Sequence, residues 1–353
     1  MPNDIEVPWR PGSATGVGSL PFSDPSEAAR VVLGELPDLP HLPELPGRGP
    51  GADMVGRACG LLVELAVDLQ PAGWRLTTGE GLDQGRGRSM LAQDLDALEE
   101  LAQGYSGPLK VQVAGPWTLA ACVERPRGGR VLGDPGARRD VAQSLAEGLS
   151  GHLVEVRGRV PGAELVVQLD EPSLPSVLAG SVPTASGFSR YRTVEEYEVL
   201  ELLRGVLDRV AGDGALPVVH SCAAGVPFDL LVRAGARGVS FDLSRVRERD
   251  LDALGAAVDG GVALLVGAVP ATRPASAAGA ATGAVTGGTG AGPSDSDVAR
   301  SVTVLWRRLG FAADEAARGC VVTPSCGLAG ADPAWARTAM ALARDAAAHL
   351  RSA

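Results

Sequence analysis

Residues 165–172, Leu165-Val166-Val167-Gln168-Leu169-Asp170-Glu171-Pro172, form a short apolar run that ends in two acids and a proline. Such a run is typical of a strand that is buried on both faces of a parallel sheet. Amphipathic stretches that are typical of helices lie elsewhere in the chain, as at residues 138–159 and 194–211. Seven further apolar runs resemble the first, at residues 15–20, 74–78, 109–114, 216–221, 238–242, 262–267 and 320–323.

The alternation of these runs with helical stretches predicts an α/β protein with a parallel sheet. Such a sheet either closes into a barrel or stays open and doubly wound, and alternation alone does not distinguish the two. A closed β/α barrel has about eight strands, so the strand count favours a single eight-stranded TIM-type barrel over residues 1–353. Residues 271–293 are nearly all Ala, Gly, Thr, Ser and Pro, which predicts a flexible low-complexity surface loop within it.

The composition excludes several classes of partner. The 353 residues carry 32 basic and 42 acidic side chains, with a net charge of −10 and a pI near 5.0. Because phosphate backbones attract basic surfaces, this balance disfavours nucleic acid. The sequence has neither an unbroken run of about 20 apolar residues nor the apolar segment of a signal peptide. We therefore expect no membrane partner and a cytoplasmic location, in which the five cysteines remain free thiols.

Potential metal ligands follow several of the predicted strands, where the functional groups of a β/α barrel gather. His220 and Cys222 are two residues apart at a strand end, so both side chains can point to the same side. Cys326 and Asp242 follow two other strands, and zinc takes ligands of these types. Two interpretations stay open from the residues alone: a zinc site, or two buried cysteines beside a hydrogen-bonded histidine.

An acidic pair, Asp170-Glu171, stands where the run at residues 165–169 ends. A carboxylate in that position can hold the ammonium group of a ligand or act as an acid or base. The alternative is a carboxylate that accepts backbone hydrogen bonds in a loop or at a helix N-terminus. The residues alone leave both interpretations open.

Five short motifs, taken together, resemble the catalytic C-terminal barrel of the cobalamin-independent methionine synthases. They occur in the order of that family and span nearly the whole chain, without the family's additional N-terminal barrel. The resemblance implies an eight-stranded β/α barrel and a zinc-dependent transfer of a methyl group to the thiol of homocysteine, which forms methionine. The motifs are Gly18-Ser19-Leu20-Pro21, Gln168-Leu169-Asp170-Glu171-Pro172-Ser173-Leu174, His220-Ser221-Cys222, Val239-Ser240-Phe241-Asp242-Leu243-Ser244-Arg245 and Pro324-Ser325-Cys326-Gly327-Leu328.

The resemblance also implies a ligand set for zinc. His220, Cys222 and Cys326 match three zinc ligands of the family, and Asp242 stands where the family has a glutamate ligand.

Further residues match the substrate site of the family. Asp170 matches the acid that holds the substrate's ammonium group, and Glu171 beside it is assigned to the same site. Ser19 matches a residue whose backbone helps to hold the substrate's carboxylate.

The implied partners are homocysteine and a methyl donor, which is a methylated folate or a methylated corrinoid, including one carried by a corrinoid protein. Two alternatives have other functions. One is a cofactor-free decarboxylase like uroporphyrinogen decarboxylase, for which the predicted strand ends lack a cluster of arginines. The other is a zinc-binding relative without enzymatic activity.

Overall fold

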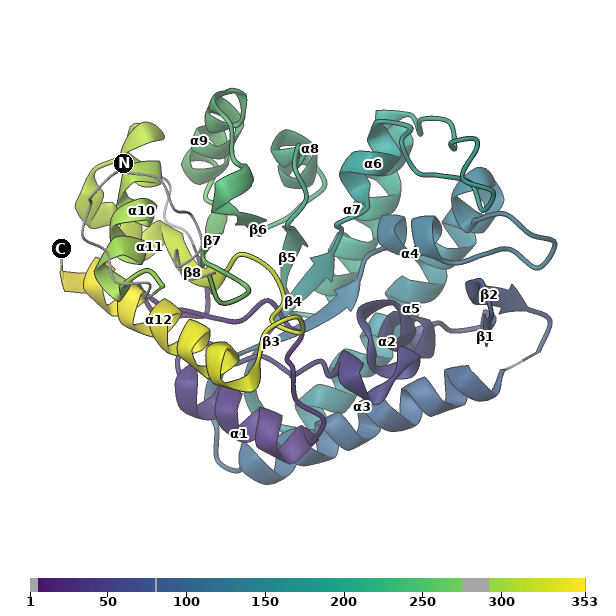
Figure 1. The fold of residues 1–353 in the computed structure, drawn as a ribbon, viewed down its shortest axis with the longest axis horizontal. Coiled ribbons are helices and arrows are strands. Elements are labelled where there is room, and N and C mark those ends of the chain that lie inside the picture. The colour runs from purple at the N-terminus through teal and green to yellow at the C-terminus, as the bar shows by residue number, and fades with distance from the viewer. Residues whose placement is uncertain (1–5, 80, 275–291, 353) are drawn as a thin grey trace, which may run out of the picture.

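The computed structural model describes residues 6–79, 81–274 and 292–352, and a curled parallel sheet of six strands is its central element (Figure 1). Each strand pairs in parallel with the next one along the chain. Helices connect the strands, which confirms an α/β protein with a parallel sheet. The six strands are β3 (Ser106–Ala114), β4 (Gly162–Asp170), β5 (Leu216–Ser221), β6 (Gly238–Asp242), β7 (Ala263–Val269) and β8 (Cys320–Pro324).

Two of the eight predicted strands are not part of this sheet. Residues 74–78 lie largely in an antiparallel ribbon, which is formed by β1 (Ala66–Gln70) and β2 (Gly73–Thr77). Residues 15–20 make one isolated bridge, at Ser19, instead of a regular strand. The prediction was wrong here because an apolar run indicates an extended chain but not its partner, and Gly16 and Gly18 weaken a strand.

Two extended segments lie between the first and the last strand of the sheet. The first segment, residues 13–20, forms a parallel bridge to β8 at Ala14, and the second segment, residues 40–45, forms a parallel bridge to β3 at His41. The two segments join at a third parallel bridge, between Ser19 and Glu44. Backbone contacts therefore lead from β8 back to β3, and the sheet curls around an interior.

Helices surround the curled sheet, as Figure 1 shows. Asp24, Asp134 and Ser294 cap three of them at their N-termini, where the side chain of each accepts backbone hydrogen bonds. The helices predicted at residues 138–159 and 194–211 correspond to α5 and α7. The helices are α1 (Pro25–Glu35), α2 (Met54–Leu61), α3 (Leu82–Leu101), α4 (Pro116–Cys122), α5 (Pro135–Arg159), α6 (Leu174–Leu178), α7 (Glu196–Gly212), α8 (Phe228–Arg233), α9 (Leu251–Asp259), α10 (Asp295–Arg308), α11 (Ala316–Gly319) and α12 (Pro333–Ser352).

Side chains along each strand alternate between the interior and the helix layer. On the interior face, β4, β5, β7 and β8 contribute to a small apolar cluster that includes Trp9 and Leu39. Nearer the C-terminal ends of the strands, the same alternation places buried polar side chains on this face. These are Lys110, Gln112, Gln168, Asp170, His220, Ser240 and Thr323.

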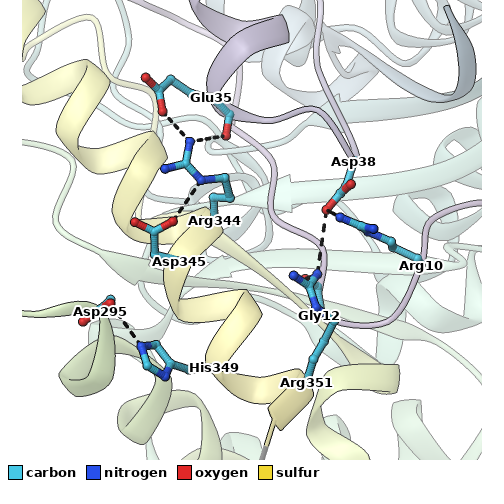
Figure 2. Close-up of polar contacts among 9 residues, drawn as sticks. All are labelled: Arg10, Gly12, Glu35, Asp38, Asp295, Arg344, Asp345, His349 and Arg351. Atoms are coloured by element: carbon cyan, nitrogen blue, oxygen red, sulfur yellow. Dashed lines mark hydrogen bonds and ion pairs between the residues drawn. The ribbon is translucent and has the colours of Figure 1, made fainter.

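Polar side chains of the C-terminal helix α12 contact the N-terminal part of the chain (Figure 2). The Arg344 guanidinium lies 2.6 Å from the carboxylate of Glu35 at the end of α1. Arg351 donates a hydrogen bond of 2.7 Å to the carbonyl of Gly12. These contacts hold residues 12–15 beside β8, where the first extended segment begins.

Most of the predicted low-complexity loop, residues 275–291, lies outside the described residues. The residues on its two sides are neighbours, because a Cβ atom added to Gly292 would lie 3.7 Å from Cδ of Pro274. Within the described parts of the chain, no helix combines the length and the apolar character that crossing a membrane requires.

Candidate functional site

Three potential metal ligands meet at the C-terminal ends of the strands. His220 lies in β5, Cys222 follows that strand, and Cys326 follows β8. One ligand atom from each lies within 4.8 Å of the other two, and the two sulfur atoms are 2.9 Å apart. In the sheet, β6 and β7 separate β5 from β8, so these contacts depend on the curl of the sheet. The predicted trio therefore forms a group that could hold a metal ion.

A neighbouring strand orients His220. Nδ1 of its ring lies 2.8 Å from Oγ of Ser240, which the β5–β6 register places opposite His220. Both side chains are buried. The contact leaves Nε2 for an ion, and histidine ligands of metals commonly bond their second nitrogen in this way. No role for Ser240 followed from the sequence, although this residue belongs to one of the motifs at the strand ends.

The two thiols of the trio differ in acidity. A hydrogen bond from Cys222 lowers the pKa of Cys326, and the nearby His220 imidazole lowers this pKa further. The same hydrogen bond raises the pKa of Cys222. By contrast, burial raises the pKa of both Cys59 and Cys320. Because the thiolate is the form that binds metals, Cys326 is the best suited of these four thiols to bind one.

The donor types of the trio fit zinc, which binds imidazole nitrogen and thiolate sulfur in four-coordinate sites. Three protein ligands leave one position for a further ligand, as in catalytic zinc sites. The orientation of the His220 ring by Ser240 and the low pKa of Cys326 both favour binding of a cation. The residues present therefore suit a zinc ion of the catalytic kind.

A cavity of about 370 Å³ opens beside the three ligands. Asp170 and Ser19 line it, and so do two other acids, Glu44 and Asp53. Asp170 is buried, and Gln168 donates a hydrogen bond of 2.7 Å to its carboxylate. A cavity with three acids beside a thiol cluster suits a ligand that carries a positive charge.

Glu171 lies apart from this cavity. Its carboxylate accepts hydrogen bonds from the backbone amides of Trp117 and Thr118, at 2.9 and 2.7 Å, and from the Thr118 hydroxyl at 2.8 Å. Burial raises the pKa of Glu171 to about 7, although these hydrogen bonds lower it. Because successive side chains leave a strand on opposite faces, Glu171 points to the start of α4 while Asp170 lines the cavity.

Asp242 also stays apart from the ligand trio. It ends β6, and its carboxylate accepts hydrogen bonds from the amide and the hydroxyl of Ser244, at 2.9 and 2.7 Å. These bonds cap a short 3₁₀ helix, Leu243–Arg245. Among the described residues, the group that could hold a metal consists of the trio without Asp242. The structure does not bring this predicted ligand to the cluster, because the following turn engages its carboxylate.

Glu44 is a cavity residue that sequence analysis missed. It lies in the second extended segment, is only 5% exposed and lines the cavity. Burial raises its pKa to about 8, against a lowering effect of Arg57. The prolines of the stretch Pro40-His41-Leu42-Pro43-Glu44-Leu45-Pro46 are spaced as in a loop. The one feature of this stretch that could have indicated a functional residue is an acid among apolar residues.

Comparison with solved structures finds matches over much of the chain. A B12-independent methionine synthase from Shewanella sp. W3-18-1, in complex with selenomethionine, has a TM-score of 0.60 at 15% identity and covers 97% of this chain and 98% of its own. GH5_18 from Streptomyces cattleya, in complex with GlcNAc, has a TM-score of 0.45 at 16% identity, over 97% of this chain and 80% of its own. D-psicose 3-epimerase from Clostridium cellulolyticum H10 has a TM-score of 0.35 at 13% identity, over 73% and 81%.

The likeness to the methionine synthase shows a related fold of the TIM-barrel type. No protein-family model matches the sequence, and no curated protein matches it.

Proposed function

We propose that this protein is a zinc-dependent methyltransferase that transfers a methyl group to the thiol of homocysteine and so forms methionine. The observation that carries the proposal is the trio of His220, Cys222 and Cys326 at the wall of a cavity lined by acids. Support also comes from the fold, which is similar to that of a B12-independent methionine synthase solved with a bound amino acid, selenomethionine.

A bound zinc ion would lower the pKa of the substrate thiol, so that a nucleophilic thiolate is present at neutral pH. His220 and the two cysteines would hold the ion, and Ser240 keeps the imidazole in its binding orientation. Asp242 would not be needed to hold the ion, because its carboxylate accepts hydrogen bonds from Ser244.

The rest of the cavity would orient the amino acid. The buried carboxylates of Asp170 and Glu44 would accept hydrogen bonds from its ammonium group. Ser19 stands at the same cavity, and its carbonyl is held by the amide of Leu328 at 2.7 Å. We assign the substrate's carboxylate to the Ser19 backbone.

We propose that the methyl donor is a methylated folate or a methylated corrinoid, which a corrinoid protein can carry.

The test measures zinc per chain and methyl transfer to homocysteine. We expect about one zinc ion in the parent protein and little in Cys222→Ala and Cys326→Ala, since each variant removes one of three ligands. Cys122→Ala is the matched control, because Cys122 is also half-buried but ends α4 outside the trio.

The possible results of this test separate the hypotheses. Turnover with methylated folate or methylated corrinoid supports the proposal and identifies the donor. Zinc without turnover on either donor points to the non-enzymatic relative. A folded parent without zinc, purified in the absence of chelators, contradicts the proposed function and favours the cofactor-free decarboxylase.

A further inference from the structure

The only lysine of the chain, Lys110, is fully buried in β3. The proposed chemistry does not use it, yet burying a charged group is costly unless nearby groups compensate it. Its ammonium group donates a hydrogen bond of 2.8 Å to the carbonyl of Val17. Burial lowers the pKa of Lys110 to about 7, whereas the carboxylates of Asp170 and Glu44 raise it. Lys110 is therefore the positive neighbour of two acids that line the cavity.

Lys110 contacts both of the extended segments between β8 and β3. Its backbone amide donates to the carbonyl of Pro40, and its own carbonyl accepts from the amide of Leu42, each at 2.9 Å. Its side chain reaches the other segment at Val17. These segments carry Glu44 and Ser19, so one residue of β3 is bonded to both chain segments that supply the cavity with those side chains.

A second buried side chain holds the same carbonyl. Nε2 of Gln168 donates to Val17 at 2.9 Å, and it also lies 2.7 Å from the carboxylate of Asp170. The Val17 carbonyl thus accepts two side-chain hydrogen bonds from the sheet. Val17 is two residues before Ser19, so this pair of bonds helps to fix the backbone that leads to Ser19.

We infer that Lys110 is a positioning residue for an α-amino acid in the cavity: it anchors the Ser19 segment through its hydrogen bond to the Val17 carbonyl, beside the acids that line the cavity. The inference rests on the proposed function and adds the residue that prepares the site for an amino acid. The charged groups that act on Glu44 are Arg57, Lys110, Asp170 and Asp53.

The first test is Lys110→Met, which keeps much of the side-chain length and removes the charge and the donor. We measure zinc content, methionine binding by calorimetry from neutral to alkaline pH, and hydrogen exchange of the Thr15 and Leu20 amides. Those amides bond to Val322 and Glu44 in the parent. The zinc content should stay unchanged, because Lys110 is not part of the ligand trio.

We expect methionine to bind about tenfold more weakly at neutral pH, because the Ser19 backbone loses the anchor that Lys110 provides at the Val17 carbonyl. Any change in the pH profile of binding should be toward higher pH, because Glu44 has lost a positive neighbour. The two amides should exchange faster, because the Val17 carbonyl keeps only its bond from Gln168.

The matched control is Gln84→Met. Gln84 is also buried and donates to two backbone carbonyls, Cys59 and Leu65, both at 3.1 Å, but it lies in α3. It should lose stability without a change in the pH profile of methionine binding. A second test variant, Gln168→Met, removes the other bond to Val17 and keeps the lysine. Gln168→Met should speed hydrogen exchange of the same amides, with a smaller shift of the pH profile of methionine binding. If Lys110→Met does not fold, this second variant tests the inference in its place.

The inference is overturned if folded Lys110→Met binds methionine with the parent's affinity and pH profile, or if neither variant speeds exchange of the segment. Failure of the proposed function is a different result: the parent itself then binds neither zinc nor methionine. In that case, the amide exchange of Lys110→Met and Gln168→Met still tests the anchoring of the Ser19 segment. Unchanged exchange in both variants refutes the anchoring, and faster exchange supports it independently of any ligand.

Discussion

Single residues outside the ligand trio control how the site works, and Ser240 is the clearest case. It is buried, and its hydroxyl contacts Nδ1 of His220 at 2.8 Å. Partners of this kind fix the ring orientation and the tautomer of a histidine ligand. At this scale, the site depends on side chains that are far apart in the sequence and adjacent across two strands.

Replacement of Ser240 by alanine should weaken zinc binding by about 10- to 100-fold, because the His220 ring loses its orienting partner. Competition with a chromophoric chelator measures the affinity. Ser144→Ala is the control, since Ser144 is a buried serine of α5 that bonds to the Val63 carbonyl. Equal zinc affinity in the Ser240 variant and the parent would show that the imidazole needs no such support.

The pH dependence of amino-acid binding should follow Glu44. Burial raises its pKa to about 8, so the carboxyl group is protonated at lower pH and must lose its proton to accept an ammonium group. Methionine affinity should therefore rise as the pH increases toward about 8, by at most about tenfold per pH unit. Glu44→Gln should bind weakly with a flatter profile.

Calorimetry across this pH range checks the prediction. Glu124→Gln is a suitable control, because Glu124 is buried outside the cavity and pairs with Arg75. A parent affinity that does not change with pH rules out Glu44 as the group that receives the ammonium.

Among the elements, the end of β4 separates two adjacent acids into different roles. Asp170 lines the cavity, and Glu171 bonds to the first turn of α4. The strand period of two explains the separation, because neighbouring side chains point to opposite faces of the sheet. Glu171 thus attaches a helix to the sheet next to the site.

Glu171→Ala should lower the free energy of unfolding by about 2–3 kcal/mol, because it leaves the buried amides of Trp117 and Thr118 without a partner. Chemical denaturation measures the change. The control is Glu164→Ala in the exposed, N-terminal part of the same strand, which should cost far less. If both variants have the same stability, the hydrogen bonds of Glu171 do not hold α4.

In the whole molecule, the curl of the sheet brings the ligands together, since β5 and β8 meet only across the interior. The extended segments from the N-terminal part of the chain complete the cavity and are held by α12 and by Lys110. The described residues that line this cavity come from residues 17–54 and from β3, β4, β5 and β8 or the residues just after these strands.

Deletion of residues 276–290 should therefore leave the zinc content and the folding unchanged. The flanking residues Pro274 and Gly292 are neighbours, at 3.7 Å from Cδ of the proline to a Cβ added to the glycine, so a short linker can join them. Elemental analysis and thermal unfolding of the deletion variant check this. A folded variant that has lost its zinc would show that the segment supports the site.

The sequence by itself determined the α/β class, indicated eight apolar runs of which six form the parallel sheet, and gave the types of ligand at the strand ends. These features follow from local properties, namely apolar runs for strands and side chains two residues apart for the pair His220 and Cys222. The sequence also indicated the acidic pair at the end of β4, and it left both roles for that pair open.

Only the tertiary structure decided which residues share the site. Cys222 and Cys326 are 104 residues apart along the chain and in contact in space, and the curl of the sheet joins them. Glu44 comes from a proline-rich segment without a strand pattern. The carboxylate of Asp242 accepts hydrogen bonds from the turn that follows it and does not join the ligand trio. Whether a carboxylate or a lysine serves a cavity depends on burial and on its neighbours from other elements, and local sequence patterns do not contain this information.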